Sequence, residues 1–177
     1  LSMSRGEVAR AETTIARAVS ICREGGRRAE LVEAMNVQGA MYAMAGRLRD
    51  AVATMRDALV IAERIEHLRL ASILKNNLGD ALLTLGEIAE AEERLYAAVE
   101  AAGRLDDHTL LSDAARNLAR AAHQRDDRER ALIWARRSVA ASQLADVIRT
   151  RASALQTLAD ILGDHEDPRH AVHELGV

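Results

Sequence analysis

One position of this 177-residue sequence is alanine every 40 residues, without a gap or a slip. The column consists of Ala11, Ala51, Ala91, Ala131 and Ala171. A glycine recurs at the same spacing, at Gly6, Gly46 and Gly86. A fixed period of this length is typical of arrays in which similar units stack on one another. The period therefore constrains the fold more than any other feature of the chain.

Each unit reads as two helices joined by a tight turn. Between residues 67 and 106, apolar residues spaced three and four apart predict one helix over 68–85 and another over 88–103. Gly86 lies between them, where a sharp turn favours a residue without a side chain. In the later units, Asp127 and Asp167 are suited to cap the second helix, and Pro168 suits a first helical position.

The composition agrees with an all-helical core. Hydrophobic residues make up 49% of the chain, but aromatic residues only 2%, and there is one proline. Such a core is built from Ala, Leu, Val, Ile and Met, and the small residues let helix backbones approach closely. The fold class we predict is all-α, a solenoid of antiparallel helix pairs with about nine helices.

The pattern Leu78-Gly79, Leu82, Ala91, Leu95 and Ala98 resembles the tetratricopeptide repeat. In that family an aromatic residue usually stands where this chain has Leu82. The family's early Trp position holds Met35, Lys75, Ala115 and Leu155, its late Pro is missing, and the family period is roughly 34 residues. The resemblance implies a right-handed superhelix. A HEAT- or armadillo-like array is the alternative, and the Gly and Ala positions argue against it.

We expect one solenoid over residues 1–177. Its units would be about 1–26 (partial), 27–66, 67–106, 107–146 and 147–177 (partial). By register, Leu1–Arg5 would end a preceding helix, and neither end shows a polar capping unit, so a fragment of a longer protein is expected. Uncovered apolar residues at the two ends would favour self-association. The candidates are Val8, Ile15, Val19, Ile161, Val172 and Leu175.

Charge and targeting signals narrow the function further. The formal net charge is −3, and the arginines of 116–137 alternate with acidic residues and lack stacking aromatics. This pattern argues against a nucleic-acid partner. No apolar run is long enough to span a membrane and no signal peptide precedes the repeats. Cys22 stands alone on an expected core face, which is consistent with a cytoplasmic protein.

Catalytic, metal and cofactor motifs are not evident in the sequence. There is no glycine-rich phosphate loop. Ser72 and Lys75 have the spacing of a penicillin-binding motif but lack the other segments of that enzyme class. His165, His170 and His173 are read as surface residues at a turn and a chain end rather than as a zinc site. We therefore expect no enzyme activity, no metal and no cofactor.

By the resemblance, the first helix of each unit lines a concave groove, and its free positions form candidate binding columns. They are Asn36, Asn76, Asn77, Asp80, Arg116, Asn117, Arg120, His123, Gln156 and Asp160. Amides can donate to and accept from a peptide backbone. Alternatively the columns form a solvated face, with Arg120 paired to Asp80 or Asp160. Leu83, Ala40 and Ala43 would instead suit a small apolar effector.

The sequence thus predicts a protein- or peptide-binding scaffold. The resemblance implies the regulatory or sensory repeat region of a bacterial signalling or transcriptional regulatory protein. A small-molecule-sensing solenoid and an accessory segment of an enzyme are the alternatives. Tyr96 and Trp134 are expected to anchor neighbouring units, although Trp134 could also mark a contact surface on the convex side.

Overall fold

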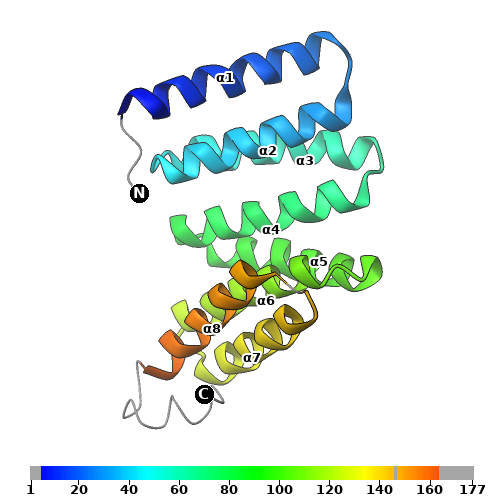
Figure 1. Ribbon diagram of the computed structural model, residues 1–177. Helices are drawn as coiled ribbons and strands as arrows, with labels where there is room; N and C mark the ends of the chain where they lie inside the picture. Colours follow the sequence, from blue (N-terminus) through cyan, green and yellow to red (C-terminus); the bar gives the residue numbers. More distant parts are fainter. Residues whose placement is uncertain (1–4, 146, 164–177) are drawn as a thin grey trace.

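The computed structural model describes residues 5–145 and 147–163, and within these ranges the chain forms eight α-helices and no strand. They stack in antiparallel order (Figure 1). The helices are α1 (Arg5–Glu24), α2 (Arg28–Met44), α3 (Leu48–Arg64), α4 (Leu68–Leu85), α5 (Ile88–Leu105), α6 (His108–Gln124), α7 (Arg128–Leu144) and α8 (Ile148–Gly163). The predicted all-α solenoid of helix pairs is confirmed. A ninth helix would fall outside the described residues, as do Asp167, Pro168 and the three histidines from His165 onward.

The helix boundaries follow the sequence pattern closely, with one error at the start. α4 and α5 begin at the predicted residues, and α5 continues two residues further than predicted, to Leu105. The predicted turn at Gly6 is wrong, because α1 begins at Arg5 and Gly6 is helical. A glycine inside a helix costs only about 0.5–1 kcal/mol relative to alanine. The 20-residue helix tolerates that cost.

The turns repeat every 20 residues, which agrees with two helices in each 40-residue unit. One residue in each of the six turns from α1 to α7 has a positive φ, between 52° and 82°. These residues are Gly26, Gly46, Glu66, Gly86, Asp106 and Asp126. At Gly46, its N–H bonds to the Ala43 carbonyl at 3.0 Å, and the next N–H bonds to the Tyr42 carbonyl at 2.8 Å. This pairing closes the helix end and points the chain back along the stack.

Small residues hold the two helices of a unit together at close range. A Cβ on Gly39 would lie 2.7 Å from the Met55 side chain, and one on Gly79 would lie 2.6 Å from Leu95. The alanines of the period-40 column that lie in the middle of the stack, Ala51, Ala91 and Ala131, are fully buried. The predicted role of the small residues in close helix packing is confirmed.

The even-numbered helices form the inner layer of the stack. The backbones of α2 and α4, of α4 and α6, and of α6 and α8 lie close together, whereas the odd-numbered helices of the described chain meet only through longer side chains, as Arg56 of α3 meets Glu90 of α5. An array in which one set of helices packs more closely curves toward that set. The candidate binding columns belong to α2, α4, α6 and α8, so they lie on this inner layer. No helix in the described ranges is long and apolar enough to cross a membrane.

Two of the apolar residues expected to lie open at the ends of the stack are buried. Val19 is 7% exposed and Ile161 is 2% exposed, because each packs into a core cluster, and Ile15 is half-buried. Val172 and Leu175 lie outside the described residues, and the side chain of Val8 is not described either. The most exposed large apolar side chain is that of Ile148 at the start of α8. The expected open apolar ends are therefore not found at Val19 or Ile161.

Candidate functional site on the inner layer

A chain of side-chain amides crosses three helices of the inner layer. Asn77 Nδ2 on α4 donates to Asn36 Oδ1 on α2 at 2.9 Å. Asn117 Nδ2 on α6 donates to Asn76 Oδ1 at 3.1 Å, and Asn76 Nδ2 donates to Asn77 Oδ1 at 3.2 Å. The 40-residue period places these asparagines at equivalent turns of neighbouring helices. The row therefore links units by hydrogen bonds.

Two amides of the row are buried. Asn117 is 0% exposed and Asn76 is 7% exposed, so each presents little surface to a ligand. α4 packs directly against α6, and these side chains lie where the helices meet. Buried amides must be paired, and they pair here with each other. Leu83, expected in the groove, is likewise buried at 2% exposure.

An ion pair lies beside the amide row. Arg120 on α6 pairs with Asp80 on α4, and its Nη1 also donates to Asn117 Oδ1 at 3.1 Å. The alternative prediction that Arg120 and Asp80 pair between neighbouring helices is confirmed. Asp160 does not join them, because it accepts a hydrogen bond from Gln156 Nε2 at 2.7 Å on the exposed face of α8.

A polar pocket of about 270 Å³ opens next to the row, between α4, α6 and α8. Its lining consists of Asn76, Asn77, Asp80, Asp113, Arg116, Asn117, Arg149, Thr150 and Ser153. Five of the ten predicted residues line it. Asn36 and Arg120 adjoin it through their partners, whereas His123, Gln156 and Asp160 do not line it.

The sequence prediction missed the outer wall of this pocket. Asp113 stands three residues before Arg116 on α6, and Arg149 and Thr150 belong to the first turn of α8. Side chains three or four residues apart share a helix face. Extending the column toward the helix start by one turn from Arg116 would have found Asp113, and by two turns from Gln156 would have found Arg149.

Arg116 brings a spare hydrogen-bond donor into the pocket. Its side chain is 23% exposed, and its Nε atom is buried without a hydrogen-bond acceptor, 4.0 Å from Asp113 Oδ1. Burial raises the pKa of the Asp113 carboxyl, and the charges of Arg116 and Arg149 oppose that rise. The site therefore combines two guanidinium groups with one partly desolvated carboxyl, and it can receive an acceptor group.

Comparison with known proteins agrees with this architecture. Residues 69–143 match the sequence profile of the tetratricopeptide repeat. This stretch, from α4 to α7, therefore consists of tetratricopeptide repeats. A search of curated proteins finds no match.

Solved tetratricopeptide structures share the fold along nearly the whole chain. BtubC (BKLC) from P. vanneervenii superimposes with a TM-score of 0.80 at 20% identity, over 97% of this chain and 72% of its own. A putative kinesin light chain of Podosopora anserina with nearly identical TPR-like repeats gives 0.73 at 16% identity, over 96% and 86%. MamA gives 0.63 at 17% identity, over 99% and 93%.

The outer layer of the tetratricopeptide stack carries an aromatic contact. Tyr96 on α5 and Trp134 on α7 meet edge to face, with ring centroids 5.7 Å apart. Arg130 Nη2 donates to the Tyr96 hydroxyl at 2.6 Å, and the Arg137 guanidinium lies 5.0 Å from the Trp134 ring centroid. The predicted anchoring of neighbouring units by these two aromatics is confirmed.

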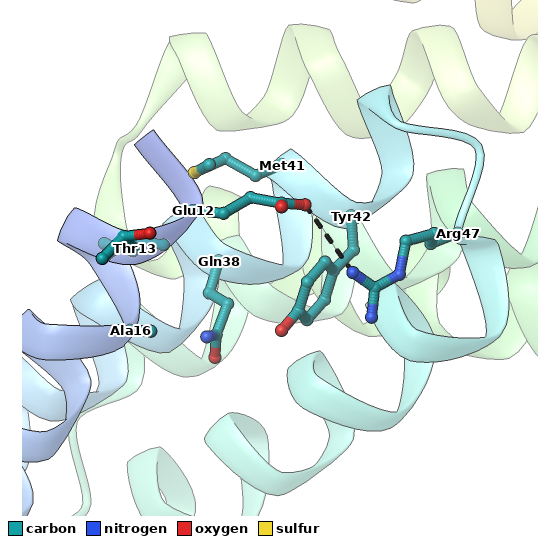
Figure 2. A pocket seen from close by; sticks show the side chains of 8 residues that line it. Glu12, Thr13, Ala16, Gln38, Met41, Tyr42 and Arg47 are labelled. Atoms are coloured by element: carbon teal, nitrogen blue, oxygen red, sulfur yellow. Dashed lines mark ion pairs between the residues drawn. The ribbon is translucent and has the colours of Figure 1, made fainter. Parts of the chain in front are cut away.

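A second pocket lies where α1 and α2, the first two helices of the stack, meet. It has a volume of about 260 Å³ and is bordered by Glu12 and Thr13 of α1 and by Gln38 and Tyr42 of α2. Figure 2 shows Arg47, at the start of α3, reaching across to Glu12, with 3.6 Å between Nη1 and Oε1. The same guanidinium lies 4.3 Å from the Tyr42 ring centroid. These contacts are exposed, and they brace the helix ends.

Within the described ranges, no group of three His, Cys, Asp or Glu side chains is arranged to hold a metal ion. His165, His170 and His173, which the sequence analysis weighed as metal ligands, lie outside those ranges.

Proposed function

We propose that this chain binds an extended segment of another protein across the inner layer of its helices. A tetratricopeptide stack is a protein-interaction scaffold, and the polar pocket between α4, α6 and α8 would be its recognition point. The observation that carries the proposal is the buried Arg116 Nε, a donor without an acceptor in a pocket lined almost wholly by polar groups. A ligand acceptor would satisfy it.

The charges of the pocket define the segment it would accept. Arg116 and Arg149 favour one acidic group, whereas Asp80 and Asp113 disfavour anions on either side. The expected segment thus carries one carboxylate flanked by neutral or basic residues. Asn36 and Asn77 are half-buried and keep unused hydrogen-bonding capacity for its backbone.

A small-molecule sensor is the less favoured function. Pockets for whole metabolites usually measure about 300–1,000 Å³ and are mainly apolar. This pocket is smaller, at about 270 Å³, and Leu83 does not line it. A side chain or chain end of a peptide fits that volume better than a complete effector.

The wider context belongs to the same proposal. We place the stack in the regulatory or sensory region of a bacterial signalling or transcriptional regulatory protein in the cytoplasm. We also propose that the stack self-associates through its ends, and light scattering of the purified chain tests this. A DNA-binding, kinase or cyclase domain in the full-length protein would support that context. A catalytic domain of metabolism would favour the accessory-segment alternative.

The test uses a peptide array followed by fluorescence titration of each hit. Arg116→Ala and Arg149→Ala should each weaken binding by about tenfold or more, since a hydrogen bond to a charged group contributes about 1.5–3 kcal/mol. Arg104→Ala is the matched control, because Arg104 lies on α5 of the outer layer and pairs only with Glu100. Asn76→Ala is unsuitable as a probe, since it also removes the bond to Asn117.

One result would place the site elsewhere. If both inner-layer variants bind as tightly as the original chain while Trp134→Ala abolishes binding, the outer layer is the binding surface. Circular dichroism of every variant controls for folding.

A further inference from the structure

A pocket distinct from the polar pocket between α4, α6 and α8 lies at the edge of the stack where α1 turns into α2. It has a volume of about 380 Å³ and is closed on its third side by the end of α3. Figure 1 shows the α1–α2 and α3–α4 connections along the same edge of the stack. The lining consists of Cys22, Arg23, Gly26, Arg28, Leu31, Ile61, Arg64 and Ile65.

Three guanidinium groups border this pocket and no carboxylate does. Arg23, Arg28 and Arg64 make no ion pair or hydrogen bond with any described residue. Several other arginines of the chain do pair with carboxylates, as Arg56 does with Glu90 at 2.6 Å. Like charges gathered around one concavity produce a local positive potential, which attracts an anion.

The repeat provides an internal comparison for these arginines. Forty residues on, the positions of Arg23, Arg28 and Arg64 hold Glu63, Leu68 and Arg104. After another forty they hold Gly103, His108 and Leu144. The helices and turns form in all three places, so packing does not require the arginines. The cluster is specific to the first turn of the stack.

The start of α2 also lacks an acceptor that its counterparts have. At α4, His67 Nδ1 accepts from the Leu70 N–H at 3.4 Å, and at α6, Asp107 Oδ1 accepts from the Leu110 N–H at 2.9 Å. The equivalent residue at α2 is Arg27, which has no acceptor and makes no side-chain cap. An anion in the pocket would meet a helix N-terminus as well as the arginines.

The floor of the pocket is apolar. Leu31 is 7% exposed, Cys22 is 9% exposed, and Ile61 packs against the main core cluster. We infer that this pocket binds a phosphate monoester whose organic part is small and apolar. A phosphate carries about −1.5 to −2 charges and three acceptor oxygens, which suits three guanidinium forks better than a single carboxylate does.

The experiment titrates the purified chain with phenyl phosphate, inorganic phosphate and benzoate at low ionic strength by calorimetry, because salt screens exposed charges. Phenyl phosphate should bind most tightly. Arg28→Gln and Arg64→Gln should each weaken it by about tenfold, the loss of a charge-assisted bond of about 1.4 kcal/mol. Arg104→Gln, at the equivalent of Arg64 in the next unit, should leave the affinity within about twofold.

Cys22 supplies an independent, site-specific readout. It is the only cysteine of the sequence and it lines the pocket. Saturating phenyl phosphate should slow its alkylation by a maleimide, and the protection should disappear in Arg28→Gln. Three results would overturn the inference: no binding by the unmodified chain, benzoate binding as tight as phenyl phosphate, or an equal loss in Arg104→Gln. Because Arg116 does not line this pocket, the outcome is independent of the peptide-binding proposal.

Discussion

The α1–α2 interface and the α3–α4 interface occupy equivalent places in the stack but are packed differently. In the first, Gln38 and Tyr42 of α2 are half-buried and border a pocket of about 260 Å³. In the second, the equivalent residues of α4 are Leu78 and Leu82, and both are 0% exposed. The period thus determines where helices lie, whereas the side chains decide how tightly each interface closes.

The polar contacts of the α1–α2 interface stabilise it less than buried leucine side chains stabilise the α3–α4 interface. Arg47 and Glu12 lie 3.6 Å apart with side chains 49% and 37% exposed. Ion pairs at such exposure contribute about 0–1 kcal/mol. Burying a leucine side chain contributes about 1.5–3 kcal/mol. We therefore expect α1 to open more readily than α3 or α4, and the following substitutions test that difference.

The largest difference should come from Leu82→Ala compared with Tyr42→Ala. Removing the fully buried Leu82 side chain should lower the free energy of unfolding by about 2–5 kcal/mol, because a cavity remains in the core. Removing the half-buried Tyr42 ring should lower it by roughly 1–2 kcal/mol. Urea denaturation followed by circular dichroism measures both.

Hydrogen exchange locates the two effects. Tyr42→Ala should speed amide exchange mainly in α1, whereas Leu82→Ala should speed it across α3 to α5. Equal stability losses for the two variants would contradict the difference in packing between the interfaces.

The alanine column gives the next largest contrast. Ala91 is fully buried, so Ala91→Leu should overpack the contact between α4 and α5 and lower the free energy of unfolding by about 1–3 kcal/mol. Ala11 occupies the same column in α1 and is half-buried, so Ala11→Leu should have a smaller effect. An unchanged urea midpoint for Ala91→Leu would show that the alanine column is not confined by packing.

Much of the fold could be predicted because it depends on local chemistry. Gly46 and Gly86 take the left-handed conformations that their turns require. Asp127 caps α7 by accepting from the Arg130 N–H at 3.1 Å, as its position before the helix suggested. Gly79 lies where Leu95 leaves no room for a Cβ. Each of these features follows from a residue type and its spacing.

The candidate site could be predicted less well because it depends on distances between helices. Periodicity placed Asn76 and Asn117 on one side of their helices, but only the direct packing of α4 on α6 determines that they are buried. The turns at Glu66 and Asp106 fall at the predicted unit boundaries, but the left-handed conformation of these two residues was not predicted. Neither residue marks a left-handed turn as clearly as glycine does, yet both have φ values above 50°.

The smallest predicted effect is that of a substitution that makes the α1–α2 interface more like the α3–α4 interface. Gln38→Leu gives the first interface the residue that Leu78 supplies in the second and Leu118 supplies in the third. Gln38 is half-buried and makes no side-chain hydrogen bond with the described residues, so the change sacrifices no protein contact. Leucine would cover part of the pocket and stabilise the stack by about 0.5–1 kcal/mol.

The matched control for Gln38→Leu is Val37→Leu on the exposed side of the same helix, where the side chain is 50% exposed. That change alters apolar area outside the interface and should shift the urea midpoint little. Exchange protection should rise in α1 for Gln38→Leu and stay constant for Val37→Leu. A loss of stability in Gln38→Leu would mean that the pocket cannot close around an apolar side chain, and that the first interface is held open by the placement of α1 rather than by the polarity of its residues.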